Sequence, residues 1–103
     1  MTEPRPPASR QATLRQALAA VLRQGDCTAR ELSQLVGLPE KAVYDHLAHL
    51  ARSLPARGEA LAMTSPECLQ CGFSFKGRSR LTRPSRCPRC HATRMTEPVF
   101  QIR

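Results

Sequence analysis

Two pairs of cysteines in the last third of the chain have the spacing of a metal site. Cys68 and Cys71 form the first pair, Cys87 and Cys90 form the second, and 15 residues separate the pairs. Two residues between cysteines allow both sulfurs of a tight turn to reach one ion, so the spacing predicts a tetrahedral four-thiolate site. Such a site is closed and leaves no coordination position for a substrate. We therefore expect one structural zinc ion per chain and no enzymatic activity.

The alternative of disulfide bonds requires an oxidising compartment. The first residues lack the apolar run of a signal peptide, and no apolar stretch approaches the length that crosses a bilayer. We therefore expect a cytoplasmic protein without membrane association, in which the thiols stay reduced and the cysteine pairs bind metal. The fifth cysteine, Cys27, lies far from the pairs in sequence, and we expect it to be a small buried residue.

The residue that follows each cysteine pair suits the backbone of a metal-binding turn. Gly72 follows the first pair and His91 follows the second. A turn of this kind needs a residue at positive φ just after its second cysteine, which glycine adopts without a steric cost. Histidine is among the residue types that are enriched at positive φ. We therefore expect a backbone role for His91, since four thiolates already complete the site.

The cysteine motifs also resemble the metal-binding turns of rubredoxins, through residues 71–75 and 87–90. Rubredoxins hold iron in four thiolates for electron transfer, and tetrahedral sulfur accepts either metal. An iron electron carrier is therefore an alternative to a zinc protein. Charge favours zinc, because rubredoxins are small acidic proteins and residues 68–103 hold eight Lys or Arg against one acid.

The positive charge of the chain is concentrated in its metal-binding half. Residues 1–67 hold eight basic and seven acidic residues, a net charge of +1, whereas residues 68–103 carry +7. Such asymmetry predicts a polyanionic partner such as nucleic acid. The same 36 residues contain few large apolar side chains. Metal binding, worth roughly 10–16 kcal/mol in zinc-finger peptides, therefore supplies much of their folding free energy.

The first half of the chain must position this module, and its apolar pattern predicts three helices. Residues 1–9 are rich in proline and are expected to be a disordered lead-in. A helix is predicted from about residue 10 to residue 24, because apolar residues recur there with helical spacing. These residues are Leu14, Ala17, Leu18, Val21 and Leu22.

A second and a third helix follow, separated by a short turn. Residues 28–31 fit a capping box, Leu32, Leu35 and Val36 form an apolar face, and Gly37 ends the helix. Proline suits a first helical position, so the third helix is predicted to begin at Pro39. Its apolar line consists of Val43, Leu47, Leu50 and Leu54, and Pro55 closes it. Two helices joined by a glycine-containing turn of three or four residues are typical of a helix-turn-helix.

The predicted fold is α+β, a three-helix winged helix-turn-helix over residues 10–66 followed by a small β zinc ribbon over residues 67–103. Residues 60–64 form a weak strand at the position of a wing, and residues 65–67 lead from it into the ribbon. No second wing strand is evident before Cys68, so we expect a short wing.

The chain resembles small prokaryotic predicted transcriptional regulators in which an N-terminal winged helix-turn-helix is fused to a C-terminal four-cysteine zinc ribbon. The resemblance lies in residues 28–32, 43–47, 68–76 and 83–90. It implies DNA-linked regulation with structural zinc.

Double-stranded DNA is the expected partner, with the third helix in the major groove and the ribbon on phosphates. We predict Glu40, Lys41, Tyr44, Asp45 and Arg52 on the third helix as contacts, and Lys76, Arg78, Arg80, Arg83, Arg86 and Arg89 on the ribbon. A homodimer is expected, through the first helix or residues 99–102, and no small-molecule substrate is evident. The alternative is a ribbon that binds structured RNA or the ribosome, although only Phe73 and Phe75 could be exposed aromatics for base stacking.

Overall fold

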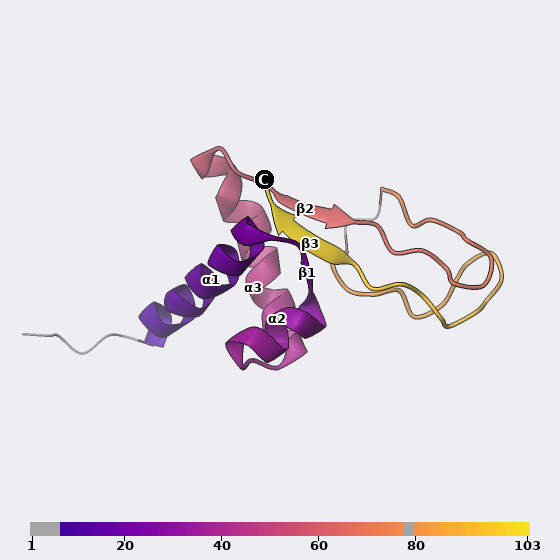
Figure 1. Cartoon of the computed structure of the whole chain (residues 1–103), viewed down its shortest axis with the longest axis horizontal. Helices are drawn as coiled ribbons and strands as arrows, with labels where there is room; N and C mark the ends of the chain where they lie inside the picture. The colour runs from indigo at the N-terminus through magenta and orange to yellow at the C-terminus, as the bar shows by residue number, and fades with distance from the viewer. Residues whose placement is uncertain (1–6, 78–79) are drawn as a thin grey trace, which may run out of the picture.

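The computed structural model describes residues 7–77 and 80–103, with side chains from residue 10, and has an α+β fold (Figure 1). Three helices and a short 3-10 helix surround one face of a three-stranded antiparallel sheet of order β1-β3-β2. The elements are α1 (Pro7–Gln24), β1 (Cys27–Thr28), α2 (Ala29–Val36), α3 (Glu40–Ser53), η1 (Leu54–Arg57), β2 (Leu61–Thr64) and β3 (Val99–Ile102). The predicted α+β class and the three helices are confirmed, whereas the winged helix-turn-helix stays a prediction.

Helix α1 begins at Pro7, three residues earlier than predicted, so part of the expected lead-in is helical. Proline is well suited to the first turn, because its missing N–H would have no intrahelical partner there. Residues 1–6 lie outside the described residues. Leu18 and Leu22 are fully buried as predicted, but Ala17 is exposed and Ala19 is buried in its place. Within the described part of the chain, no helix is both long and apolar enough to cross a membrane.

The corner between α2 and α3 has the local interactions that the sequence predicts. Thr28 caps α2, because its Oγ1 accepts the Glu31 N–H at 3.1 Å while the Glu31 carboxylate accepts the Thr28 N–H at 2.9 Å. Gly37 ends α2 with φ 77°, and its N–H donates to the Ser33 carbonyl at 2.9 Å. Helix α3 begins at Glu40, so Pro39 precedes the helix instead of starting it.

The main core lies between the three helices and the sheet. Its fully buried members are Leu18, Leu22, Leu32, Val43, Leu47 and Phe100, with Leu50, Leu54 and Ile102 nearly buried around them. The predicted apolar line of α3 is therefore confirmed. We expected Leu35 on the buried face of α2, but its side chain is 65% exposed. Only a narrow face of this eight-residue helix is buried, and it contains Ala29 and Leu32.

Strand β3, formed by almost the last residues of the chain, is the central strand of this sheet. It pairs with β1 through Cys27 and Phe100 and with β2 through Met63 and Phe100. Residues 99–102, which we assigned to the ribbon, thus complete the core of the helical half. The partner of the predicted wing strand β2 comes after the ribbon, which is why no second strand was evident before Cys68. Val99 and Phe100 are paired on both sides, whereas Gln101 and Ile102 are paired only with β2, and the dimer contact through these residues stays a prediction.

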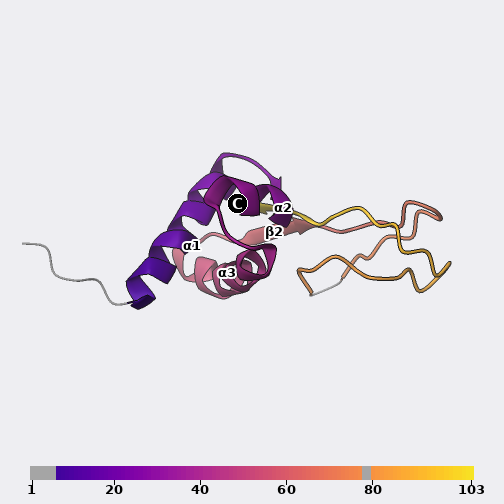
Figure 2. The ribbon, with the colours of Figure 1, turned by 90° about the horizontal axis from the view of Figure 1, so that it is seen from below.

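Residues 65–98 form the metal-binding half and project from the end of β2 and β3, away from α1 (Figures 1 and 2). Short β-bridges organise this segment, one between Glu67 and Ser74 and one between Cys68 and Met95. Its own small cluster of buried residues consists of Cys68, Cys87 and Met95. The sheet therefore connects two separate cores.

Replacement of Phe100 should test whether β3 holds the helices together. We expect Phe100→Ala to lower the free energy of unfolding by about 3–5 kcal/mol, because it leaves a cavity in the helical core. The neighbouring, half-buried Gln101 supplies a matched control, and Gln101→Ala should change stability by less than about 1 kcal/mol. Denaturant unfolding followed by helical circular dichroism would measure both, and equal effects would contradict this role of β3.

Candidate metal centre

The four cysteines that the spacing singled out meet in space. Their Sγ atoms all lie within 4.8 Å of one another, with 3.5 Å between Cys68 and Cys90 and 3.6 Å between Cys71 and Cys87. A tetrahedral zinc–thiolate site with bonds of about 2.3 Å places its sulfurs about 3.8 Å apart. The observed cluster therefore has the size of such a site. Cys27 lies on β1, half-buried beside the helical core, and is not part of the cluster.

Each cysteine pair sits in a tight turn of the same design. In the first turn, the Cys68 N–H donates to the Phe73 carbonyl at 2.8 Å, and the Gly72 N–H donates to the Cys68 carbonyl at 3.0 Å. Gly72 has φ 77°, the left-handed conformation that we expected after the second cysteine. This conformation turns the chain back so that both sulfurs face the same side.

The second turn repeats this pattern with histidine in place of glycine. The Cys87 N–H donates to the Ala92 carbonyl at 2.9 Å, and the His91 N–H donates to the Cys87 carbonyl at 2.9 Å. His91 is the one non-glycine residue at positive φ in the described chain, with φ 63°. The predicted backbone role of His91 is confirmed. The residue costs some strain here, and the two hydrogen bonds of the turn hold it in place.

The electrostatics of the sulfur cluster favour a bound cation. The Cys71 amide donates a hydrogen bond toward the Cys68 sulfur and lowers the pKa of Cys68 to about 6. The Ala92 amide also favours the Cys90 thiolate, but burial and the three neighbouring sulfurs outweigh it and raise the pKa of Cys90 to about 12. Four thiolates this close repel one another, so all four can be ionised together near neutral pH only when a cation compensates them.

An apolar shell covers the inner side of the cluster. Cys68, Cys87 and Met95 are buried, whereas Cys71 is exposed. Phe73 and Phe75 pack against this group and against each other, edge to face, with 5.0 Å between ring centroids. We expected these two rings to be exposed, but both are half-buried against the sulfur cluster, which is a further argument against base stacking.

The donor set fits a soft or borderline metal ion. Four cysteine sulfurs at tetrahedral spacing bind zinc or iron in preference to magnesium or calcium, which require oxygen ligands. All four positions are taken by protein sulfur, so the site can hold the two turns together but offers no place for a substrate.

The predicted nucleic-acid contacts fall on two surfaces. Lys41, Asp45 and Arg52 are exposed on α3, and Lys76, Arg80, Arg83, Arg86 and Arg89 are exposed on the metal-binding half. Arg78 lies outside the described residues. Tyr44 on α3 is only half-exposed because it packs against the helical core, as does Leu81 in a returning loop of the metal-binding half.

The contact of this loop with α3 was not predictable from local patterns. Leu81 packs against the helical core. Burial raises the pKa of the Tyr44 phenol, with further contributions from the charges of Glu40 and Glu97, while nearby Arg83 opposes them. Arg83 therefore lies close enough to α3 for the two predicted surfaces to be neighbours.

Two family models match consecutive parts of the chain. Residues 13–62 match a model described as PF0610-like, N-terminal, and residues 65–103 match the PF0610 rubredoxin-like zinc beta-ribbon domain. Over these two ranges the chain is similar to a PF0610-like N-terminal domain followed by a zinc β-ribbon. This supports the predicted ribbon, whereas the resemblance to transcriptional regulators remains a proposal.

A solved structure resembles the whole chain. It is the solution NMR structure of protein PF0610 from Pyrococcus furiosus, with a TM-score of 0.77 and 26% sequence identity. The match covers 100% of this chain and 96% of PF0610. Its continuous coverage shows that the zinc ribbon and the N-terminal domain are arranged in a similar way in both proteins. A comparison with curated proteins found no match.

Replacement of a single buried ligand should abolish metal binding. We expect Cys87→Ser to reduce the bound metal from one ion per chain to nearly none, because Cys87 is fully buried and supplies one of the four sulfurs of the cluster. Elemental analysis of the purified protein would measure the metal content. Cys27→Ser is the control, since Cys27 lies outside the cluster, and it should keep one ion. Equal metal content in both variants would refute the four-sulfur site.

Proposed function

We propose that this protein is a DNA-binding transcriptional regulator in which zinc has a purely structural role. The observation that carries the proposal is the position of the basic metal-binding half beside α3. Leu81 packs against the helical core, and the charge of Arg83 acts on Tyr44. A recognition helix and a phosphate-binding surface would then face the same duplex.

The charge of the metal-binding half supports zinc rather than an electron-transferring iron. Residues 68–103, which comprise most of this half together with β3 and Arg103, carry +7, and a divalent ion with four thiolates contributes −2, which leaves a net charge near +5. A surface of this sign suits a polyanion, and arginine binds phosphate especially well because its planar guanidinium donates two parallel hydrogen bonds.

The helical half supports a winged helix-turn-helix. A capped α2, a left-handed glycine and α3 follow one another at the tight corner that such motifs use. The antiparallel strands β2 and β3 stand where a wing would stand, and the zinc ribbon takes the place of the wing's turn. In this arrangement α3 enters the major groove by its N-terminal end, where Lys41 and Asp45 are exposed.

The electrostatic part of this proposal predicts a steep dependence of DNA affinity on salt. If the protein neutralises six to eight phosphates, a plot of log affinity against log salt has a slope of about −5 to −7. We expect the double variant Arg83→Ala/Arg86→Ala to reduce this slope by about 2, because two phosphate contacts are lost. Fluorescence anisotropy with a labelled duplex at several salt concentrations would measure the slopes.

The control variant is Arg103→Ala, since this exposed residue follows β3 at the end opposite the ribbon and should leave the slope unchanged. A wild-type slope near zero would refute phosphate binding by the ribbon. If the protein prefers duplex RNA to duplex DNA in direct competition, the basic surface is an RNA-binding surface. If the purified protein is red and its visible absorption changes reversibly, the bound metal is iron.

A further inference from the structure

Arg15 on α1 contacts a buried histidine on α3. The Arg15 guanidinium lies 3.5 Å from Nδ1 of His46, and His46 is only 5% exposed. A guanidinium donates hydrogen bonds but cannot accept them, so it can pair only with an Nδ1 that carries no proton. The His46 ring is therefore neutral in this arrangement, with its proton on Nε2.

The groups around His46 oppose a positive charge on its ring. Burial lowers the pKa of His46, and the charges of Arg15 on α1 and His49 on α3 itself also lower it. Among the described residues only Asp45, which is exposed on α3, acts in the opposite direction. A proton on His46 would place a second cation beside Arg15, where little water screens the two charges.

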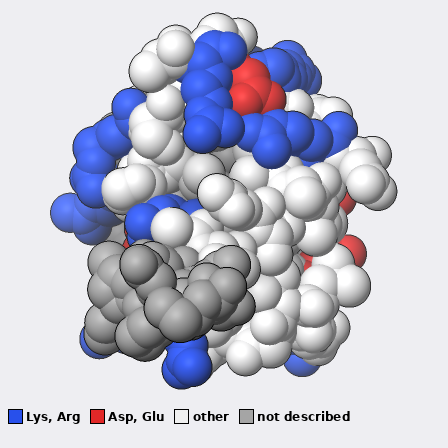
Figure 3. Space-filling model, turned by 90° about the vertical axis from the view of Figure 1, so that its left-hand side faces the viewer, with Lys and Arg blue, Asp and Glu red and all other residues white. Residues whose placement is uncertain are grey.

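The other elements that pack against α3 add no compensating acid. Strand β2 has no charged residue, and the charged residues of α2 (Arg30 and Glu31) and of η1 (Arg57) are exposed. None of these three charges is among those that act on the pKa of His46. Figure 3 looks onto the side of the molecule where α1 and η1 lie in Figure 1, and basic side chains gather toward its top around one small acidic patch. The described surroundings of His46 therefore stabilise its neutral form.

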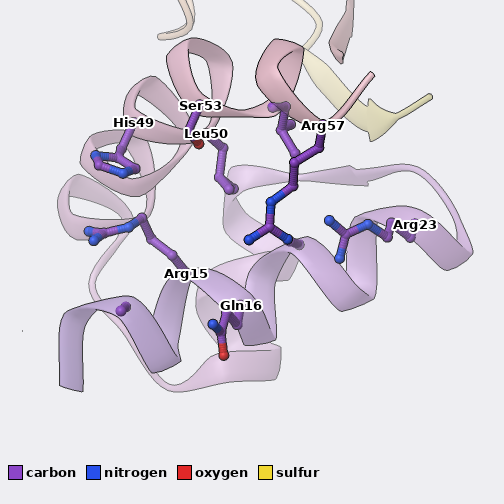
Figure 4. A pocket seen from close by; sticks show the side chains of 10 residues that line it. Arg15, Gln16, Arg23, His49, Leu50, Ser53 and Arg57 are labelled. Atoms are coloured by element: carbon purple, nitrogen blue, oxygen red, sulfur yellow. The ribbon is translucent and has the colours of Figure 1, made fainter. Parts of the chain in front are cut away.

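A cavity lies beside this contact, between α1 and the end of α3. Its volume is about 230 Å³, and Arg15 and His49 both line it. In Figure 4, Arg15 extends from α1 toward the turn of α3 that carries His49. The two helices are therefore not closely packed at this position, and the contact of Arg15 with His46 connects them beside the cavity.

The C-terminal half of α1 is firmly attached to the rest of the helical half. Leu18 and Leu22 are fully buried in the main core. Arg23 forms a two-pronged ion pair with the Glu59 carboxylate, with distances of 2.8 and 2.9 Å. None of these contacts involves a histidine.

The preceding part of α1 has little apolar burial. Within residues 10–17 no side chain is buried, and Ala12, Leu14 and Arg15 are only half-buried. The contact of Arg15 with His46 therefore supplies a substantial share of what holds these residues against α3.

We propose that the contact between Arg15 and His46 is an acid-sensitive switch, in which protonation of His46 releases residues 10–17 of α1 from α3. Because the pKa of His46 is lowered while α1 is docked, the docked state binds fewer protons than the released state. The stabilisation by this contact is fully present above about pH 6.5, the ordinary pKa of histidine, and is lost as the pH falls through the lowered pKa. The proposal does not rest on DNA binding.

Amide NMR spectra of the metal-loaded full chain, recorded from about pH 7.5 to about pH 5 on both sides of the ordinary histidine pKa, test this switch. The ring signals of His46 report its protonation, and elemental analysis at each pH reports whether the metal stays bound. We expect the amide signals of residues 10–17 to shift with the same midpoint as the His46 ring. Their hydrogen-exchange protection should be lost, because a short helical segment without packing is marginal in water, whereas Leu47 in the core should keep its protection.

Three variants separate the switch from other effects of acid. His46→Gln should remove the response, because glutamine does not ionise and its side-chain oxygen can still accept a hydrogen bond from Arg15. His49→Gln, at an exposed position one turn further along α3, is the matched control and should respond nearly as the wild type does. Arg15→Met keeps a long side chain without the charge and should move the midpoint of His46 to higher pH. This last variant keeps the test valid if His46→Gln disturbs the core.

Several outcomes would overturn the proposal. Equal acid responses in the wild type and His46→Gln would exclude His46 as the group that titrates. Unchanged signals of residues 10–17 while His46 becomes protonated would exclude release of α1, and a His46 ring that stays neutral down to about pH 5 would exclude switching in mild acid. Loss of metal with the same midpoint would assign the response to the metal centre, and a simultaneous change of all amide signals would assign it to unfolding of the whole chain.

Discussion

The pairing of β3 with both β1 and β2 is the constraint on which the rest of the structure depends. This strand follows the metal-binding half in sequence, yet its Phe100 is fully buried among residues of the three helices. The chain must therefore leave the helical half after β2, complete the metal turns and return. Because both ends of the metal-binding half are attached to neighbouring strands, its position relative to α3 is set by the sheet rather than by a flexible linker.

Within the metal-binding half, sulfur and backbone amides replace the usual apolar core. The buried group consists of only Cys68, Cys87 and Met95, with two half-buried phenylalanines against it. Mutual repulsion of four thiolates would oppose this packing without a cation. Metal binding and folding of this segment are therefore one process, as in other small domains that bind structural metals.

The distribution of charge gives the two halves different roles. The helical half is nearly neutral, and three of its arginines line one cavity. The metal-binding half has a large excess of basic residues, and those that the structure describes are exposed. A broad basic surface suits the repeating charges of a nucleic acid.

Local patterns in the sequence determined the metal ligands, the left-handed residue after each cysteine pair, the capping box at Thr28 and the buried line of α3. Each of these depends on residues a few positions apart, which their spacing reveals. The tertiary structure alone decided the place of residues 99–102, the contact of Leu81 with the helical core and the ion pair of Arg23 with Glu59. These features join residues distant in sequence, and a four-residue apolar strand is compatible with either half of the chain. The core contains a space that Phe100 fills, so packing rather than local preference assigned the last strand to the helices.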